Sequence, residues 1–126
     1  MDKTALVSVE IEKGAELLDA LDRAEVPVSI ALWANLSEYG DWRFILADRH
    51  FDVPDPRTAY GSLHEPLSSA GLTPRNTPPI LILPTSDSFI RELRRKYRKA
   101  KPQGARISGQ LIGDRFVEDA YIYRVL

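Results

Sequence analysis

The sequence contains no cysteine, and it has only two histidines and one methionine among 126 residues. The lack of cysteine excludes disulfides, thiolate metal sites and a cysteine nucleophile, and it fits a reducing compartment. The sequence also lacks the run of about 18 apolar residues that a membrane-spanning helix needs, and its start does not have the pattern of a signal peptide. We therefore expect a cytoplasmic protein that does not contact membranes.

The common catalytic motifs are missing as well. The sequence has no P-loop, no G-x-G-x-x-G, no H-E-x-x-H and no G-x-S-x-G elbow. Segments 28–36 and 42–48 contain no lysine, which excludes the pattern of metal-dependent nucleases that combine a carboxylate with an acid-x-Lys triplet. These absences favour a protein that is not an enzyme and holds no cofactor.

The composition is that of an ordinary globular domain, with 44% hydrophobic and 28% charged residues. A chain of this length predicts a single domain over residues 1–126. The charge is unevenly distributed along the sequence: residues 1–90 carry 7 Lys and Arg against 14 Asp and Glu, whereas residues 91–126 carry 10 against 4. Such polarity points to a charged partner or to self-association.

The hydrophobic pattern predicts an α+β fold with the order α-β-β-α-β-α-β-β. In segment 7–24, apolar residues recur at helical spacing, namely Val7, Ile11, Ala15, Leu18 and Leu21. Alternation and turn residues predict one hairpin from 28–36 and 42–48, and a second from 106–112 and 116–125. A short helix around 58–69, a buried strand at 80–83 and a helix from Ser86 to about Lys99 complete the order. We expect a mixed five-stranded sheet with the helices packed on it.

Two segments of the predicted hairpins, ALWANLSEYGDWRF and VEDAYIYRV, together resemble stretches in a group of small uncharacterised bacterial proteins. The likeness would span most of the chain. No activity is attached to that group, so the resemblance implies no site and no mechanism.

The helix predicted after Ser86 carries an arginine-rich face. Its apolar stripe consists of Ile90, Leu93 and Tyr97. At 100° per residue, four arginines fall within an arc of about 100° beside that stripe: Arg91, Arg94, Arg95 and Arg98. Lys101 joins the arc if the helix continues, and Lys99 adds to the positive charge. The planar guanidinium group suits phosphates and carboxylates, so this face predicts contact with nucleic acid or with an acidic protein.

Other interpretations of these arginines stay open. A solvated basic face near the C-terminus of a helix is favoured by the helix dipole alone. The acidic first helix could also pair with the arginines inside the fold or across a dimer; its acidic residues are Glu10, Glu12, Glu16, Asp19, Asp22 and Glu25. The domain as a whole is not basic, which counts against strong non-specific DNA binding.

A second candidate site is the segment Asp48-Arg-His50-Phe-Asp52. If the strand that begins at Trp42 continues through it, Asp48, His50 and Asp52 point to the same face of the sheet. Two carboxylates and an imidazole can bind a divalent metal that activates water. Pro54 follows closely, however, and loop Asp and His residues are common for turn and capping reasons alone.

The leading hypothesis is therefore a non-enzymatic binding module that uses the arginine face. The alternatives are a metal-dependent hydrolase built on Asp48, His50 and Asp52, and a self-assembling structural protein that uses its charge polarity or an exposed strand edge. The aromatic pairs Trp33 with Trp42 and Tyr121 with Tyr123 are expected to pack in the core or across strands.

Overall fold

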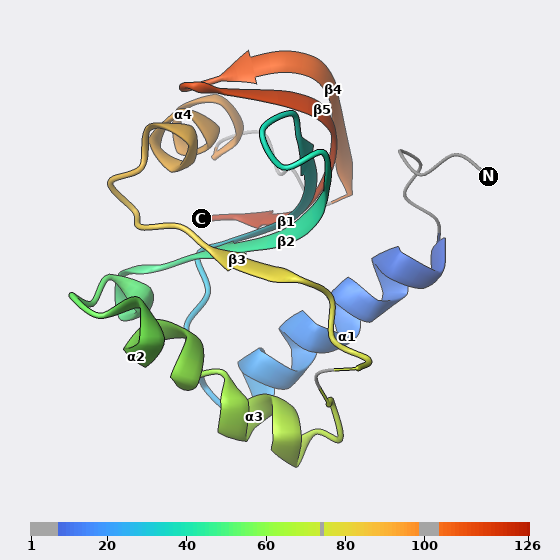
Figure 1. Ribbon diagram of the computed structural model, residues 1–126, viewed down its shortest axis with the longest axis vertical. Helices are drawn as coiled ribbons and strands as arrows, with labels where there is room; N and C mark the ends of the chain where they lie inside the picture. The colour runs from blue at the N-terminus through green and yellow to red at the C-terminus, as the bar shows by residue number, and fades with distance from the viewer. Residues whose placement is uncertain (1–7, 74, 99–103) are drawn as a thin grey trace.

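Five strands form one mixed sheet in the spatial order β3-β2-β1-β5-β4 (Figure 1). The structure is a computed structural model that describes residues 8–73, 75–98 and 104–126. The strands are β1 (Ile30–Leu36), β2 (Asp41–Ala47), β3 (Ile80–Ile82), β4 (Ala105–Ile112) and β5 (Arg115–Val125). β1 pairs antiparallel with both β2 and β5, β4 pairs antiparallel with β5, and β3 runs parallel to β2. Both predicted hairpins are confirmed.

The central position of β1 explains its composition. All seven residues of its sequence IALWANL are buried, because the strand has a neighbour on each side and helices on both faces. β4, at the edge of the sheet, alternates between buried and exposed positions. The pattern of each strand therefore follows its place in the sheet.

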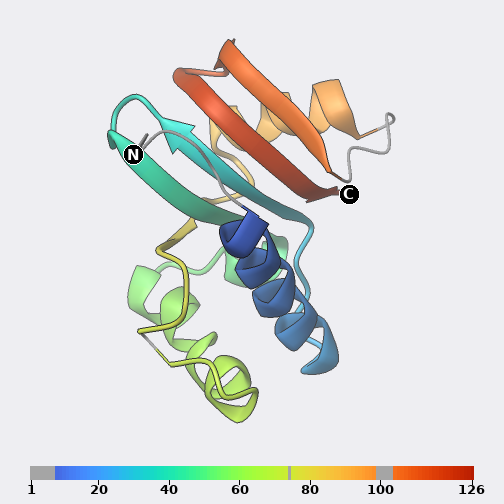
Figure 2. The same ribbon diagram turned by 90° about the vertical axis from the view of Figure 1, so that its right-hand side faces the viewer.

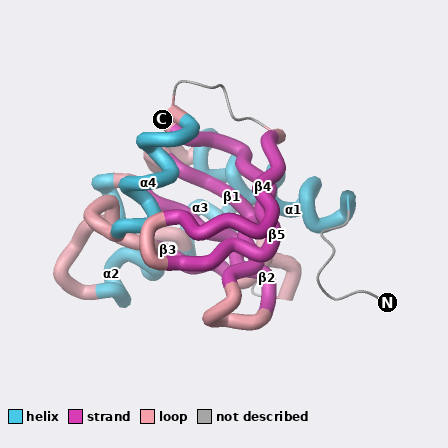
Figure 3. Tube along the Cα trace, turned by 90° about the horizontal axis from the view of Figure 1, so that it is seen from above, coloured by secondary structure: helices cyan, strands magenta, loops and turns pink. Residues whose placement is uncertain are grey.

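The helices lie on both faces of the sheet. They are α1 (Ser8–Arg23), α2 (Pro56–Gly61), α3 (His64–Ser69) and α4 (Ser88–Tyr97), with a 3₁₀ turn, η1, at Arg49–Phe51. In Figure 2, α1 crosses in front of the sheet and α4 lies behind it, and from above the strands lie between these two helices (Figure 3). The predicted α+β class and the order of elements are confirmed.

Two hydrophobic clusters correspond to the two faces. α4 contributes Phe89, Ile90 and Leu93, each fully buried, to a cluster with inward side chains of β1, β2, β4 and β5, and Leu81 of β3 packs against it. α1 packs into the other cluster through Leu17, Leu18 and Leu21, together with aromatic residues of β1 and β2 and with α2 and α3. The sheet therefore separates a face that carries α1 from a face that carries α4.

Two details of the predicted elements need correction. The helix expected around 58–69 is divided into α2 and α3, and Asp55 caps the first of them by accepting a hydrogen bond from the Arg57 amide at 3.0 Å. On α1 the buried stripe includes Gly14 and Leu17, whereas Ala15 is exposed. The buried surface of α1 is wider than the predicted stripe and includes a neighbouring row of residues. The spacing of apolar residues does not show which of the two rows is buried.

Candidate functional site

The arginine-rich helix forms as predicted. α4 begins where Asp87 caps it, since its carboxylate accepts a hydrogen bond from the Phe89 amide at 2.9 Å. Phe89, Ile90 and Leu93 face the sheet, and Tyr97 is half-buried against the same cluster. The arginine side chains occupy the remaining surface of the helix, and they do not all have the same environment.

One arginine is paired within the helix. Arg95 donates two hydrogen bonds to the Glu92 carboxylate, at 2.9 Å and 2.6 Å. The hydrogen bond from Arg95 lowers the pKa of Glu92, and the same contact raises the pKa of Arg95. Glu92 thus offsets one positive charge on this surface.

The other arginines are less engaged. Arg94 is half-buried, and its Nε donates to the backbone oxygen of Leu126 at 3.1 Å. Arg91 and Arg98 are exposed, and neither side chain forms a hydrogen bond or ion pair with a described residue. Lys99 and Lys101 lie outside the described residues. The outer surface of α4 therefore presents Arg91, Arg98 and part of Arg94 to solvent.

The acidic residues of α1 do not neutralise this surface. Asp22 pairs with Arg124 of β5 at 2.6 Å, and Asp19 pairs with Arg23 one turn along α1 at 2.9 Å. Because α1 and α4 lie on opposite faces of the sheet, the intramolecular pairing that we considered for the arginines is wrong within the described residues. Segments 8–25 and 88–98 instead carry opposite net charges on opposite faces.

The start of α4 is held by a charged contact that sequence reasoning missed. Arg115, at the beginning of β5, donates to Asp87 at 3.1 Å and also to Glu38 in the β1–β2 turn. Burial disfavours the charged guanidinium, but the hydrogen bonds to both carboxylates outweigh it and raise the pKa of Arg115 above its ordinary value. The Ser88 hydroxyl donates to Asp114 at 2.7 Å, and this bond lowers the pKa of Asp114. Only the turn residues at 113–114 hinted at this junction in the sequence.

The alternative metal site at Asp48, His50 and Asp52 is not assembled. β2 ends at Ala47, and η1 follows at once, so Asp48, His50 and Asp52 do not share one face of a strand. Asp48 accepts hydrogen bonds from the Ser29 hydroxyl and from the His50 amide, and Asp52 accepts two from Thr85.

Asp48 therefore caps η1 and is bound to Ser29, and Asp52 connects the end of η1 to the segment that contains Thr85. The condition for a common face, a strand that continues beyond Asp48, is not met, and the capping role that we weighed against it is observed at Asp48. Across the described ranges, no group of three or more His, Asp and Glu side chains is placed to hold a metal ion.

The aromatic residues serve the core, as expected. Trp33 and Trp42 are 3% and 7% exposed, and their rings meet edge to face with centroids 6.5 Å apart. They are diagonal neighbours, since Trp33 is directly opposite Phe44 in the register. Tyr121 and Tyr123 share one face of β5, with ring centroids 5.1 Å apart.

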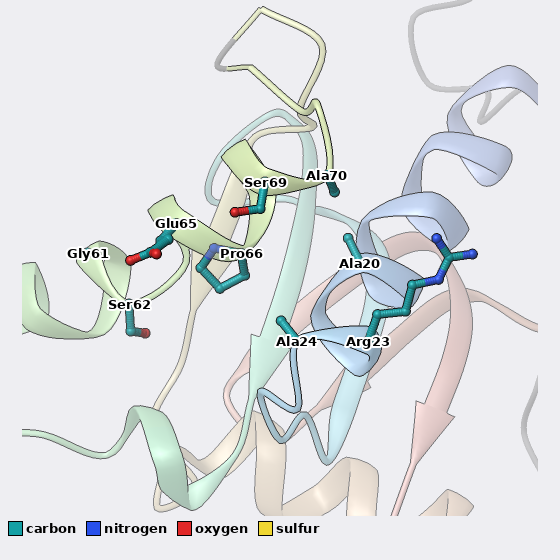
Figure 4. A pocket seen from close by; sticks show the side chains of 9 residues that line it. All are labelled: Ala20, Arg23, Ala24, Gly61, Ser62, Glu65, Pro66, Ser69 and Ala70. Carbon is teal, nitrogen blue, oxygen red and sulfur yellow. The ribbon is translucent and has the colours of Figure 1, made fainter.

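A hollow of about 620 Å³ lies between α1 and α3 (Figure 4). Its walls are mostly small residues, such as Ala20, Ala24 and Ala70. Arg23 borders it, but its side chain points away from α3 and pairs with Asp19. The chemistry of this hollow selects no ligand.

Comparisons with family models, with curated proteins and with solved structures gave no match. No helix in the described part of the chain is both long and apolar enough to cross a membrane. The arginine surface of α4 is therefore assessed on its geometry alone.

Proposed function

We propose that this protein is a non-enzymatic binding module that contacts nucleic acid through the outer surface of α4. The observation that carries the proposal is the solvent exposure of Arg91 and Arg98 on a helix whose opposite side is fully anchored in the core. A rigid helix that displays guanidinium groups can bind phosphates with little loss of conformational entropy. A cytoplasmic location, which the absence of cysteine favours, suits such a ligand.

The dimensions of the helix support a nucleic-acid ligand. Its ten residues extend for about 15 Å, and the arginines from Arg91 to Arg98 span about 10 Å of its axis. That span corresponds to about three nucleotides of one strand at 3.4 Å each. A helix of this kind also fits the major groove of B-DNA, which is about 12 Å wide.

Charge segregation supports the same conclusion. The acidic residues of α1 face the other side of the sheet, where they would be held away from a phosphate backbone bound at α4. A chain with a net charge of −1 can bind a polyanion in this way only through one localised surface. The predicted affinity is consequently modest and sensitive to salt.

The test is a titration of fluorescently labelled single-stranded RNA, single-stranded DNA and double-stranded DNA at 50 and 200 mM salt. Contacts with two to four phosphates predict that the affinity falls about 10- to 150-fold over this range. The variant Arg91→Glu with Arg98→Glu should abolish binding while remaining folded. Its matched control is Arg23→Glu with Arg57→Glu, which makes the same change in net charge at two exposed arginines distant from α4.

The proposal is wrong if the wild type binds none of the three oligonucleotides at 50 mM salt. It is equally wrong if the two double variants lose affinity to the same extent, because the effect would then follow net charge and not the α4 surface. Sedimentation at both salt concentrations separates the alternative of self-assembly, which predicts oligomers in the absence of nucleic acid.

A further inference from the structure

The two edges of the sheet differ in how well they are protected from pairing with another strand. β3, at one edge, has only three residues and lies between Pro79 and Pro84. Because Leu83 donates to a carbonyl of β2, the neighbouring Ile82 amide points away from the sheet, and the Tyr60 hydroxyl accepts its hydrogen bond at 3.0 Å. Short length, flanking prolines and a covered amide are features by which proteins keep an edge strand from pairing with another chain.

β4 forms the opposite edge and lacks these features. It is eight residues long and contains no proline. Within the described ranges no strand pairs with its outer side, and Figure 2 shows it, in orange, at the rim of the sheet. The backbone amides and carbonyls that alternate residues direct to that side are therefore available to another strand.

An exposed apolar pair lies at this open edge. Ile107 of β4 is buried in the cluster with α4, so a regular alternation would bury Leu111 on the same face. Gly109 has a φ of 60°, and the alternation reverses beyond it: Ile112 is buried and Leu111 is 64% exposed. Phe116, directly opposite Leu111 in the register, is 42% exposed. The kink at Gly109 thus leaves two large apolar side chains in solvent at the end of the hairpin.

Charge does not oppose the approach of an identical strand. The one charged residue of β4 is Arg106, and it is paired with Asp119 of β5 at 2.7 Å. Natural edge strands commonly carry unpaired charges, above all lysine, which keep a second strand away. β4 has no such charge, so its open edge suits a second copy of itself.

From these observations we propose that two copies of this chain pair antiparallel through their β4 strands and form one continuous sheet. Antiparallel pairing of identical edges requires a twofold axis roughly perpendicular to the sheet, so both α4 helices lie on one face and both α1 helices on the other. The Leu111 side chain of each copy packs beside the strand of the other. The outer edges of the joined sheet are the two protected β3 strands, so assembly stops at the dimer.

This dimer differs from an assembly driven by the opposite charges of the α1 and α4 faces. Contacts between unlike faces do not close on themselves and continue into larger oligomers, and salt weakens them. Strand pairing gives a closed dimer that persists in salt and needs neither nucleic acid nor the α4 arginines. The proposal therefore does not rest on the nucleic-acid contact.

Sedimentation without nucleic acid is the first test. A single-strand interface is small, so the measured mass should rise from 14.2 kDa to twice that value between about 5 and 500 μM protein. The dimer should persist at about 0.5 M salt and in Arg91→Glu with Arg98→Glu. A monomer at every concentration, or oligomers larger than a dimer, would overturn the proposal. Loss of the dimer in salt or in the arginine variant would assign the association to the charged faces instead.

The second test places a charge on the open edge. Leu111→Lys should remain folded, because Leu111 is largely exposed, and it should sediment as a monomer at concentrations where the wild type is a dimer. The matched control is Val9→Lys, the same kind of change at a residue of α1 that is 56% exposed, and it should dimerise as the wild type does. Equal losses in the two variants, or an intact dimer in Leu111→Lys, would show that β4 is not the interface.

Hydrogen exchange separates strand pairing from contact through the apolar side chains alone. Backbone amides of segment 105–112 that face solvent in the monomer should exchange about tenfold more slowly at the highest protein concentration than at the lowest. Segment 80–82, at the protected edge, should exchange at the same rate at both concentrations. If the wild type dimerises and segment 105–112 gains no protection, the copies associate elsewhere and the proposed pairing is wrong.

Discussion

α1 and α4 both bury apolar side chains against opposite faces of the same sheet, but they differ in how closely the helix backbone approaches the strands. α4 docks through apolar side chains that are completely buried. α1 approaches the sheet closely at Gly14, where the Trp33 indole N–H donates to the Glu10 carbonyl at 2.9 Å and the Tyr123 hydroxyl donates to the Ile11 carbonyl at 2.5 Å.

This difference separates stability from surface chemistry. Apolar packing is nondirectional, so the outer surface of α4 is free to carry arginines without affecting how the helix docks. α1 also buries leucines, but near Gly14 it adds two hydrogen bonds to side chains of the sheet and leaves no room for a Cβ atom. A small change at that point should therefore alter how α1 docks. α4 is consequently the better place for a binding surface, and the predictions below measure how far the two faces differ.

The largest effect is expected from the core of the α4 face. Leu93→Ala removes a fully buried side chain and should lower the free energy of unfolding by about 2–5 kcal/mol. Leu111→Ala is the control, since Leu111 is 64% exposed and its loss should change stability by no more than about 0.5 kcal/mol. Chemical denaturation measures both. Equal effects would mean that α4 is not packed as described.

A smaller but more diagnostic effect is expected at Gly14. A Cβ atom added there would lie 2.7 Å from Phe44 and 2.8 Å from the Trp33 Nε1, and closer still to the Tyr123 hydroxyl. Replacing glycine by alanine inside a helix ordinarily stabilises it by about 1 kcal/mol. At Gly14 we expect the opposite sign, a loss of about 1–3 kcal/mol through overpacking.

Gly61 in α2 provides the matched control, because nothing lies within 4 Å of the corresponding Cβ position. Gly61→Ala should be neutral or stabilising in the same thermal melts. A stabilised Gly14→Ala variant would contradict the close docking of α1.

The third prediction concerns pH and again probes the α1 face. Burial raises the pKa of Tyr123 above its ordinary value of 10.0, and the neighbouring Tyr121 adds to this effect. In the unfolded chain Tyr123 loses its proton near the ordinary value, so its contribution to stability is complete below that pH and is lost as the pH rises towards the folded pKa. Melting temperatures should therefore fall more steeply above pH 10 for the wild type than for Tyr123→Phe.

At neutral pH we expect the wild type to be the more stable of the two proteins. Tyr123→Phe loses the hydrogen bond to the Ile11 carbonyl and should be less stable by about 0.5–1.5 kcal/mol. Parallel pH profiles of the two proteins would show that the hydroxyl is not buried against α1.

Much of this architecture is readable from the sequence, because hairpins and the helix cap depend on local patterns. The strand expected in segment 28–36, the turn that follows it and the cap near Ser88 are local features, and all three are observed. The arginine surface on α4 follows directly from helical spacing in the same way.

What failed depends on contacts between distant segments. Nothing near Asp48 or Asp52 in the sequence indicates that Ser29 and Thr85 would engage their carboxylates. Asn35 is one polar residue in an apolar strand, and only the strand register shows that it lies opposite Asp119 of β5. The same limit hid Arg115, whose partners Glu38 and Asp87 are far from it in the sequence.

The smallest effect on stability is expected where the effect on binding should be largest. In Arg91→Glu with Arg98→Glu, no recorded contact to a described residue is lost, and neither side chain belongs to the core. The four arginines repel one another at spacings of three and four residues, at about 0.2–0.5 kcal/mol per pair.

Charge reversal replaces this repulsion by attraction to Arg94 and Arg95. A glutamate at 98 is disfavoured by the helix dipole by about 0.3–1 kcal/mol, which offsets part of the gain. The variant should therefore melt at or slightly above the wild-type temperature in low salt, and the difference should vanish near 1 M salt as the charges are screened. A lower melting temperature in low salt would instead assign the arginines to the maintenance of the fold, and the loss of nucleic-acid binding by the same variant would no longer isolate a binding surface.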